Sequence, residues 1–444
     1  MTGEGAAPIL LGCIADDLTG ATDVALMLEK TGMRTVQTIG VPGGPLRVAA
    51  DAVVVALKSR TVPVTEAVAG SLAALEWLRG RGARQILFKY CSTFDSTAEG
   101  NIGPVTDALM DELGVRFTIA VPSLPVNGRT QYLGHLFIDG QLLSESPLRH
   151  HPLNPMTDAN LVRHLQAQTR RKVGIVPCPI VRGGSAAISA EIARLQADGV
   201  AIALVDVITD DDLTAIAAAA AEMPLVTAGS GLGMTLPAVW RQRGWIADEK
   251  VRAPSPRPRA AAGVLVLAGS CSARTLEQIR AFEAARYPTL PIDVRRLLLG
   301  GAPEETARVT DEVVRVLAAA PAALVSSSMT PEDRDALLTQ AQERGISAEA
   351  ARRTIEHTLA TIATRAVERG TRQIVVAGGE SAGAVVEALR VSALEIGTVI
   401  EPGVPHCRSV GAEPLDLVLK SGNFGGPDFF IKAVRFLRAE EGVS

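Results

Sequence analysis

The sequence predicts a two-domain α/β protein, and three observations support that fold class. The chain has 444 residues, which is too long for one ordinary hydrophobic core. Hydrophobic residues make up 47% of it but aromatic residues only 3%, so we expect a core of Ala, Val, Leu and Ile, as in parallel sheets covered by helices. Short apolar runs are repeatedly followed by a polar or glycine-rich loop and a helical pattern. We therefore expect two domains, each a largely parallel sheet flanked by helices, with an active site in the cleft between them.

Charge and cysteine content narrow the function classes. The formal net charge is -4 and the pI is near 6.0, so neither nucleic acid nor a membrane is an expected partner. The five cysteines are widely spaced and form no Cys-x-x-Cys pair, which favours a reduced cytoplasmic location over disulfides or a zinc site. The start of the chain lacks the pattern of a signal peptide, and no apolar run reaches the length of a membrane span. A homo-oligomer is compatible with these features.

Apolar runs and turn residues divide the chain into elements and domains. In the first half we expect strands at 8–15, 52–57, 85–88, 117–121, 173–176, 201–207 and 225–228. Residues 132–157 have no regular pattern and are expected to be irregular. A proline-rich stretch, 246–262, reads as a linker between domains at 1–245 and 263–444. Strands of the second half are expected at 263–268, 373–377 and 415–420.

Two loops in the first half carry groups suited to a small hydroxylated anion. Asp16 and Asp17 follow the first strand, at the sheet edge where α/β proteins bind ligands. The loop that begins at Lys89 adds one ammonium, the Asp95 carboxylate and several hydroxyls within nine residues. Arg60 follows another strand. The alternatives are that one aspartate only caps a helix, that the hydroxyl-rich loop only starts the next helix, and that the cations form surface ion pairs.

Glycine-rich loops follow three strands of the second half. They are Gly269-Ser270-Cys271-Ser272, Gly378-Gly379-Glu380-Ser381 and Ser421-Gly422. Exposed backbone N–H groups beside a helix start or a turn attract phosphate, so the three loops together predict a nucleotide site. The sequence has no Walker A loop and no Gly-x-Gly-x-x-Gly after the first strand.

Two further motifs allow a functional and a structural interpretation. The glycine cluster 229–233 could approach a ligand or form a tight turn into a helix. The pair His150-His151 is a weak metal signal, because neighbouring side chains on an extended chain point apart and no third ligand has a supporting spacing.

The two sets of loops together fit phosphoryl transfer from a nucleotide to a small hydroxylated acid. Lys89 and Arg60 are the expected partners of a substrate carboxylate. Asp17 or Asp16 is expected to orient the attacking hydroxyl, with Asp95 as the alternative. Glu380 could bind Mg²⁺ through water, or could only complement a helix dipole.

The same motifs resemble those of the four-carbon acid sugar kinases over essentially the whole chain. Segments 14–21, 89–97, 101–109 and 125–130 carry the resemblance in the first half, and the glycine loops carry it in the second. Within the family the chain is most similar to 3-oxo-tetronate kinases. The resemblance implies ATP-dependent phosphorylation of a four-carbon 3-oxo acid at its terminal hydroxyl, with Mg²⁺, by an N-terminal substrate domain and a C-terminal nucleotide domain. It implies substrate contacts at Asp16, Arg60, Lys89, Tyr90, Cys91, Ser92 and Thr93, and ATP contacts at Ser270, Ser272, Gly378, Gly379, Glu380, Ser381 and Gly422.

The resemblance leaves two other functions open. One is a kinase for D-threonate, D-erythronate or L-threonate. The other is a sugar-acid sensor that binds nucleotide without turnover.

Overall fold

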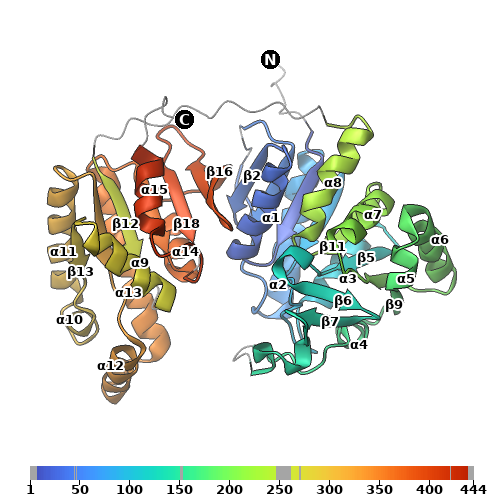
Figure 1. Ribbon diagram of the computed structural model, residues 1–444, viewed down its shortest axis with the longest axis horizontal. Helices are drawn as coiled ribbons and strands as arrows, with labels where there is room; N and C mark the ends of the chain where they lie inside the picture. The colour runs from blue at the N-terminus through green and yellow to red at the C-terminus, as the bar shows by residue number, and fades with distance from the viewer. Residues whose placement is uncertain are drawn as a thin grey trace. The chain divides into compact units, whose positions relative to one another are not determined.

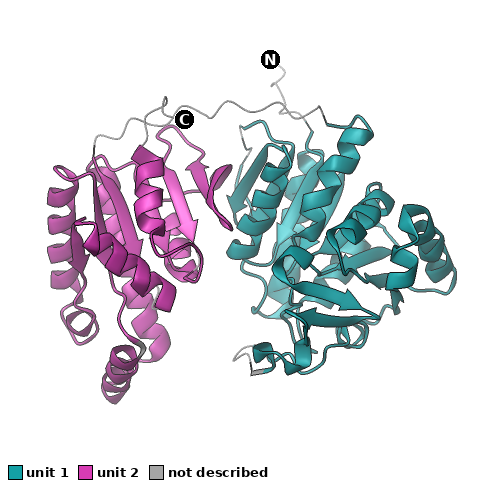
Figure 2. Ribbon diagram, in the orientation of Figure 1, with its two compact units in different colours: residues 1–252 teal, residues 253–444 magenta. Residues whose placement is uncertain are grey.

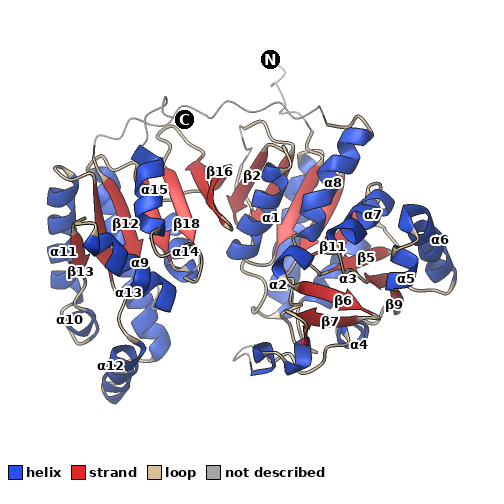
Figure 3. Ribbon diagram, viewed as in Figure 1, coloured by secondary structure: helices blue, strands red, loops and turns tan. Residues whose placement is uncertain are grey.

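A computed structural model describes residues 8–44, 46, 48–150, 154–246, 262–269, 272–420 and 422–438. The chain divides into two compact units, residues 1–252 and 253–444 (Figure 2). Each unit is a sheet covered by helices (Figure 3), which confirms the predicted α/β class. Most of the predicted linker, together with Ser270 and His151, lies outside the described residues. None of the helices in the described ranges is both long and apolar enough to cross a membrane.

The sheet of unit 1 is parallel throughout, in the order β2-β3-β1-β4-β11-β5-β10-β9. From β1 the chain runs to the edge strand β2, returns to β3 between the two, and then crosses to β4 on the other side of β1. A topological switch point therefore lies beside β1. The strands are β1 (Leu11–Ala15), β2 (Thr35–Ile39), β3 (Ala52–Ala56), β4 (Gln85–Lys89), β5 (Thr118–Val121), β9 (Val173–Val176), β10 (Ile202–Val205) and β11 (Leu225–Ala228). β2 was not predicted, because two threonines and a glutamine interrupt its apolar pattern.

The helices of unit 1 pack against this sheet (Figure 1). They are α1 (Leu18–Lys30), α2 (Val64–Gly80), α3 (Ile102–Leu113), α4 (Leu161–Gln166), α5 (Cys178–Val181), α6 (Gly184–Ala197), α7 (Asp210–Ala220) and α8 (Gly231–Gln242). α1 starts at Leu18, because the Asp17 carboxylate accepts a hydrogen bond from the Gly20 N–H and caps the first turn.

Part of the region predicted to be irregular, 132–157, is a small antiparallel sheet. Its strands are β6 (Arg129–Tyr132), β7 (His135–Ile138) and β8 (Gln141–Leu142). The buried carboxylate of Asp206 holds the β6–β7 turn in place: it accepts hydrogen bonds from the N–H groups of Leu133 (2.6 Å) and Gly134 (3.0 Å) and from the Gln131 side chain (3.1 Å). The prediction missed this sheet because its anchor comes from a residue far along the chain.

The sheet of unit 2 has the order β13-β14-β12-β15-β18-β17-β16. Pairs among the first five strands are parallel, whereas β17 is antiparallel to both β18 and β16. The strands are β12 (Val264–Ala268), β13 (Thr289–Pro291), β14 (Ala322–Ser326), β15 (Gln373–Ala377), β16 (Ala393–Glu401), β17 (Val404–Ser409) and β18 (Asp416–Lys420). The strand order reverses between β12 and β15, so the loops after these two strands flank a second switch point.

Helices cover this sheet as well. They are α9 (Ala273–Ala284), α10 (Val294–Leu298), α11 (Ala302–Leu317), α12 (Pro331–Glu343), α13 (Ala348–Glu368), α14 (Gly379–Ala388) and α15 (Phe429–Arg438). Phe282 of α9 and Phe429 and Phe430 of α15 bury their rings against Val266 and Val375 of the sheet. Several of the chain's few aromatic residues thus lie where two helices meet one face of unit 2.

Candidate active site

Three carboxylates converge on one guanidinium at the carboxyl edge of unit 1. The Nε and Nη2 atoms of Arg60 donate to the two carboxylate oxygens of Asp16 at 2.8 and 2.9 Å. Nη2 also lies 3.0 Å from Asp17 Oδ1, and Nη1 lies 3.7 Å from Asp95 Oδ2. Four residues predicted from separate loops therefore meet at one point. The bidentate edge of Arg60, which was expected to grip a substrate, faces Asp16.

The three carboxylates differ in their surroundings. Asp16 is buried, and this burial raises the pKa of its carboxyl group while the hydrogen bonds from Arg60 oppose the rise. The Asp17 side chain is 31% exposed, and Asp95 is intermediate at 17%. Asp17 also caps α1, so the structural alternative applies to it, but capping uses only Oδ1. Asp17 is thus the carboxylate of the three that is most open to a ligand.

Asn101 fixes the loop that carries Arg60. Its side-chain amide donates to the carbonyls of Ser59 (2.8 Å) and Val62 (2.9 Å), on either side of Arg60. The Ser59 N–H in turn donates to the Asp16 carbonyl at 2.9 Å. Asn101 was not among the predicted site residues. In the sequence Asn101 stands where asparagine usually caps a helix, and the structure shows that its side chain makes no such hydrogen bond.

Lys89 is buried at the end of β4, between β1 and β11. Its Nζ donates to the Tyr90 carbonyl at 2.8 Å. Both the Lys89 ammonium and Asp17 lie against the Cα of Gly20: a Cβ at that position would stand 3.0 Å from Lys89 Nζ and closer still to Asp17 Oδ1. The structure therefore brings Lys89 to the carboxylate cluster.

The next four residues divide between the core and the loop. The buried Tyr90 ring packs edge-on against Phe88 and Phe94, and its hydroxyl lies 3.0 Å from Thr227 Oγ1, so its side chain turns away from the cluster. Cys91 Sγ lies 2.9 Å from the Oγ1 of Thr93, which is buried, and Ser92 is half-buried beside them. The predicted contact at Tyr90 can involve only its backbone.

The glycine cluster after β11 is explained by close packing. A Cβ on Gly229 would overlap the Pro122 carbonyl oxygen, and one on Gly231 would lie 2.7 Å from the Ser123 carbonyl oxygen. Between them, the Ser230 hydroxyl donates to the Asp23 carboxylate of α1. Of the two interpretations of this cluster, the tight turn is the one that the contacts support.

Substituting Gly20 by alanine should disturb the carboxylate cluster specifically. The added Cβ pushes against Asp17 and Lys89, so we expect kcat/KM to fall at least tenfold, with a loss of stability of about 1 kcal/mol. Gly70→Ala on α2 is the matched control, because its nearest neighbour would be Leu57 at 3.9 Å and alanine favours helix. Steady-state kinetics with thermal unfolding checks this, and equal activity of the two variants would contradict it.

In unit 2 the glycine loops line a pocket of about 690 Å³. Gly269 follows β12, and Gly378, Gly379, Glu380 and Ser381 follow β15, so the pocket lies at the switch point. α14 begins at Gly379 without a side-chain cap, and Gly378 has φ of 124°, which favours glycine. The first N–H groups of the helix remain available to an anion. The pocket thus meets the requirements for binding phosphate.

Three donors surround the Gly422 carbonyl oxygen at another edge of this pocket. They are Ser272 Oγ (2.8 Å), Thr275 Oγ1 (3.0 Å) and Lys420 Nζ (2.9 Å). Ser272 also caps α9 by accepting from the Thr275 N–H. Ser272 therefore holds the Gly422 loop in place, and Lys420, which was not predicted as a site residue, contributes equally to this cluster. Its signal was a lysine at the end of a buried strand.

Glu380 takes part in an ion pair. Its carboxylate lies 2.9 Å from Arg352 Nη1, and the side chain is 65% exposed. Arg352 also pairs with Glu356 at 3.1 Å. Both residues line the pocket, so Glu380 serves there at least to hold Arg352 beside the start of α14.

The lysine beside Gly422 should give unit 2 a pH-dependent stability. Burial, together with the charge of Arg274, lowers the pKa of Lys420 to about 8. Between pH 8 and about 10.5 the unfolded chain holds a proton on this lysine that the folded chain has released, so the contribution of Lys420 to stability rises with pH across this window, by up to about 3 kcal/mol. Burial raises the pKa of the Cys13 and Cys407 thiols to about 12, so these two groups lower stability above about pH 9, equally in the parent and in Lys420→Met. Denaturant unfolding at pH 7.5, 9 and 10.5 should therefore show the free energy of unfolding of the parent rising relative to that of Lys420→Met. A parallel pH dependence in both would contradict it.

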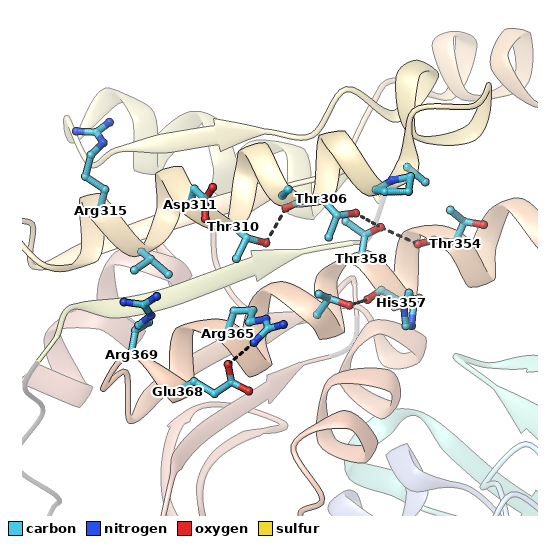
Figure 4. Close-up of a pocket in the computed structure, with 15 residues that line it drawn as sticks. Thr306, Thr310, Asp311, Arg315, Thr354, His357, Thr358, Arg365, Glu368 and Arg369 are labelled. Atoms are coloured by element: carbon cyan, nitrogen blue, oxygen red, sulfur yellow. Dashed lines mark hydrogen bonds and ion pairs between the residues drawn. The ribbon is translucent and has the colours of Figure 1, made fainter.

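A second pocket of unit 2, about 870 Å³, lies between α11 and α13 (Figure 4). Threonines line much of it. The hydroxyls of Thr310 and Thr358 donate to the Thr306 and Thr354 carbonyls of their own helices (2.6 and 3.0 Å), and the Thr306 and Thr358 hydroxyls lie 3.3 Å apart, across the two helices. None of the predicted site residues lies in it.

Comparison with known proteins agrees with this division of the chain. Residues 11–236 match the family model described as a sugar-binding N-terminal domain, and residues 265–430 match the model described as a nucleotide-binding C-terminal domain. The two matches define a protein with a sugar-binding and a nucleotide-binding domain.

The chain belongs to the four-carbon acid sugar kinase family. A 3-oxo-tetronate kinase from Burkholderia multivorans is 50% identical over 442 residues, covering 98% of this chain and 99% of the relative. One from Salmonella typhimurium is 43% identical, covering 96% and 98%. A crystal structure from Haemophilus influenzae superposes with a TM-score of 0.83 at 40% identity (95% and 98% covered), and one from Salmonella typhimurium with 0.87 at 41% (96% and 99%).

Proposed function

We propose that the chain is an ATP-dependent 3-oxo-tetronate kinase, which transfers a phosphoryl group to the terminal C4 hydroxyl and forms 3-oxo-tetronate 4-phosphate. The observation that supports this proposal most strongly is that eight relatives, 43–50% identical over at least 96% of the chain, are all named 3-oxo-tetronate kinase.

The acid substrate is bound by the cluster in unit 1. Lys89 and the Nη1 edge of Arg60 supply positive charge for its carboxylate, while Asp16 holds the other edge of Arg60. Asp17, whose side chain is the most exposed of the three carboxylates, orients the C4 hydroxyl and accepts its proton as the new O–P bond forms. The buried neighbours keep these groups in one geometry, so little reorganisation precedes transfer.

The nucleotide is bound in the unit 2 pocket, with its phosphates at the start of α14 and beside Gly422. Mg²⁺ needs few protein ligands, so it would be held mainly by phosphate oxygens and water and would neutralise charge on the phosphates. Glu380, which lines the pocket, is the carboxylate among the predicted ATP contacts that would hold it through water.

A substrate panel tests the function. Purified enzyme is incubated with ATP and 3-oxo-tetronate, D-threonate, D-erythronate or L-threonate; ADP release is followed with a coupled assay, and the product is identified by phosphorus NMR. We expect the highest kcat/KM for 3-oxo-tetronate. A preference for one of the other acids would reassign the substrate, and binding of ATP and acid without ADP release would favour the sensor.

A further inference from the structure

The nucleotide pocket has an apolar wall that the glycine loops do not explain. Six apolar side chains from α10, α12, α13 and the loop after β14 line it: Val294, Leu298, Met329, Leu337, Leu338 and Ile355. Met329, Leu338 and Ile355 are only half-buried. The apolar surface that they expose to water in the pocket is unfavourable, and a ligand that covers it would be stabilised. Ligand sites typically combine such a wall with a few polar groups.

One buried polar group beside this wall has no partner. Ser327 follows β14 and lines the pocket, its residue is 3% exposed, and its hydroxyl makes no hydrogen bond within the described part of the chain. An unsatisfied buried hydroxyl is costly. The Ser327 oxygen has almost no accessible surface, so a ligand atom completes it once the side chain turns towards the pocket. By contrast, the hydroxyls of Thr306, Thr310 and Thr358 in the α11–α13 pocket all have hydrogen-bond partners.

The wall and the phosphate-binding loops belong to one cavity. The start of α14 is charged and hydrogen-bonding, whereas the wall offers only dispersion and burial. A nucleotide is divided in the same way as the cavity: it has anionic phosphates at one end and a flat, largely apolar base at the other. A volume of about 690 Å³ falls within the usual range for such ligands.

We propose that the apolar wall is the nucleobase subsite of this chain, and that the Ser327 hydroxyl binds the ribose-phosphate part of the same nucleotide. The inference rests on the proposed function in that the nucleotide is taken to be ATP. It adds to the nucleotide site residues that lie outside the glycine-rich loops.

Matched ligands with and without a base test the wall. Isothermal titration of the full chain with ADP and with pyrophosphate compares the same two phosphates. In Met329→Ala/Ile355→Ala we expect the Kd for ADP to rise about tenfold and the Kd for pyrophosphate to change less than twofold. Val314→Ala, a half-buried apolar residue of the α11–α13 pocket, should change neither. An unchanged Kd for ADP, or an equal rise in the Kd for ADP and for pyrophosphate, would overturn the subsite. If thermal unfolding shows that the double variant is misfolded, the single variant Met329→Ala replaces it.

Neighbouring serines test the polar contact. Ser327→Ala should raise the Kd for ADP about fivefold. Ser328→Ala, whose hydroxyl donates to the Ala268 carbonyl at 3.2 Å, should leave it within twofold. Equal effects of the two would overturn the role of Ser327. These titrations contain no acid substrate, so a negative result rejects the nucleobase subsite and says nothing against the kinase activity. Conversely, if the wall variants weaken ADP binding but the enzyme does not phosphorylate 3-oxo-tetronate, the proposed function is rejected and the subsite is kept.

Discussion

Arg60→Met should lower kcat/KM for the acid by at least about a thousandfold and destabilise the protein by about 3 kcal/mol. Arg60 is the shared partner of Asp16, Asp17 and Asp95, and its side chain is only 19% exposed. Without it, Asp16 is a buried carboxylate that has lost two charge-assisted hydrogen bonds, and the substrate loses a cation. Steady-state kinetics and urea unfolding measure the two effects.

Two variants separate the possible causes. Arg34→Met removes an exposed arginine from its pair with Asp51 and should cost less than about 1 kcal/mol, with activity retained. Asp16→Asn/Arg60→Met removes the stranded charge, so it should regain part of the lost stability without regaining activity. If Arg60→Met keeps near-normal kcat/KM, the cluster is not the acid site.

Asp17→Asn should reduce kcat by about a hundredfold or more while the ATP Kd and the stability stay nearly unchanged. Asparagine caps helices as well as aspartate does, so α1 keeps its first turn and only the charge is lost. Pre-steady-state and steady-state rates with saturating ATP give kcat, and thermal unfolding gives the stability.

Asp17→Ser is a second test of the role of this carboxylate, because serine also caps a helix but carries no carboxylate. Its loss of kcat should equal that of Asp17→Asn. Asp95→Asn should have a smaller effect if Asp17 orients the hydroxyl. A larger loss for Asp95→Asn than for Asp17→Asn would exchange their roles.

The sequence was informative where one segment decides both structure and chemistry. Continuous apolar runs located β1, β4 and β15, and the residues that follow each strand were predicted as site residues because parallel strands end at one edge. Family membership and the α/β class were confirmed. Which of the site residues act on substrate or ATP stays a prediction.

The residues that were missed act over long distances in the chain. Asn101 reaches a carbonyl 42 residues away, and Lys420 shares an acceptor with Thr275, 145 residues away. Neither contact leaves a local pattern. Tyr90 was assigned to the site through the family resemblance, which covers the whole segment 89–93, and its side chain enters the core.

The anchoring of the β6–β7 turn by Asp206 has a consequence for synthesis. The carboxylate and the Leu133 N–H that it accepts are 73 residues apart. At a translation rate of about 5–20 residues per second, the hairpin leaves the ribosome roughly 4–15 s before its anchor does. During that interval its strands have no fixed place, and the nascent chain exposes them to chaperones or to wrong pairing until residue 206 emerges.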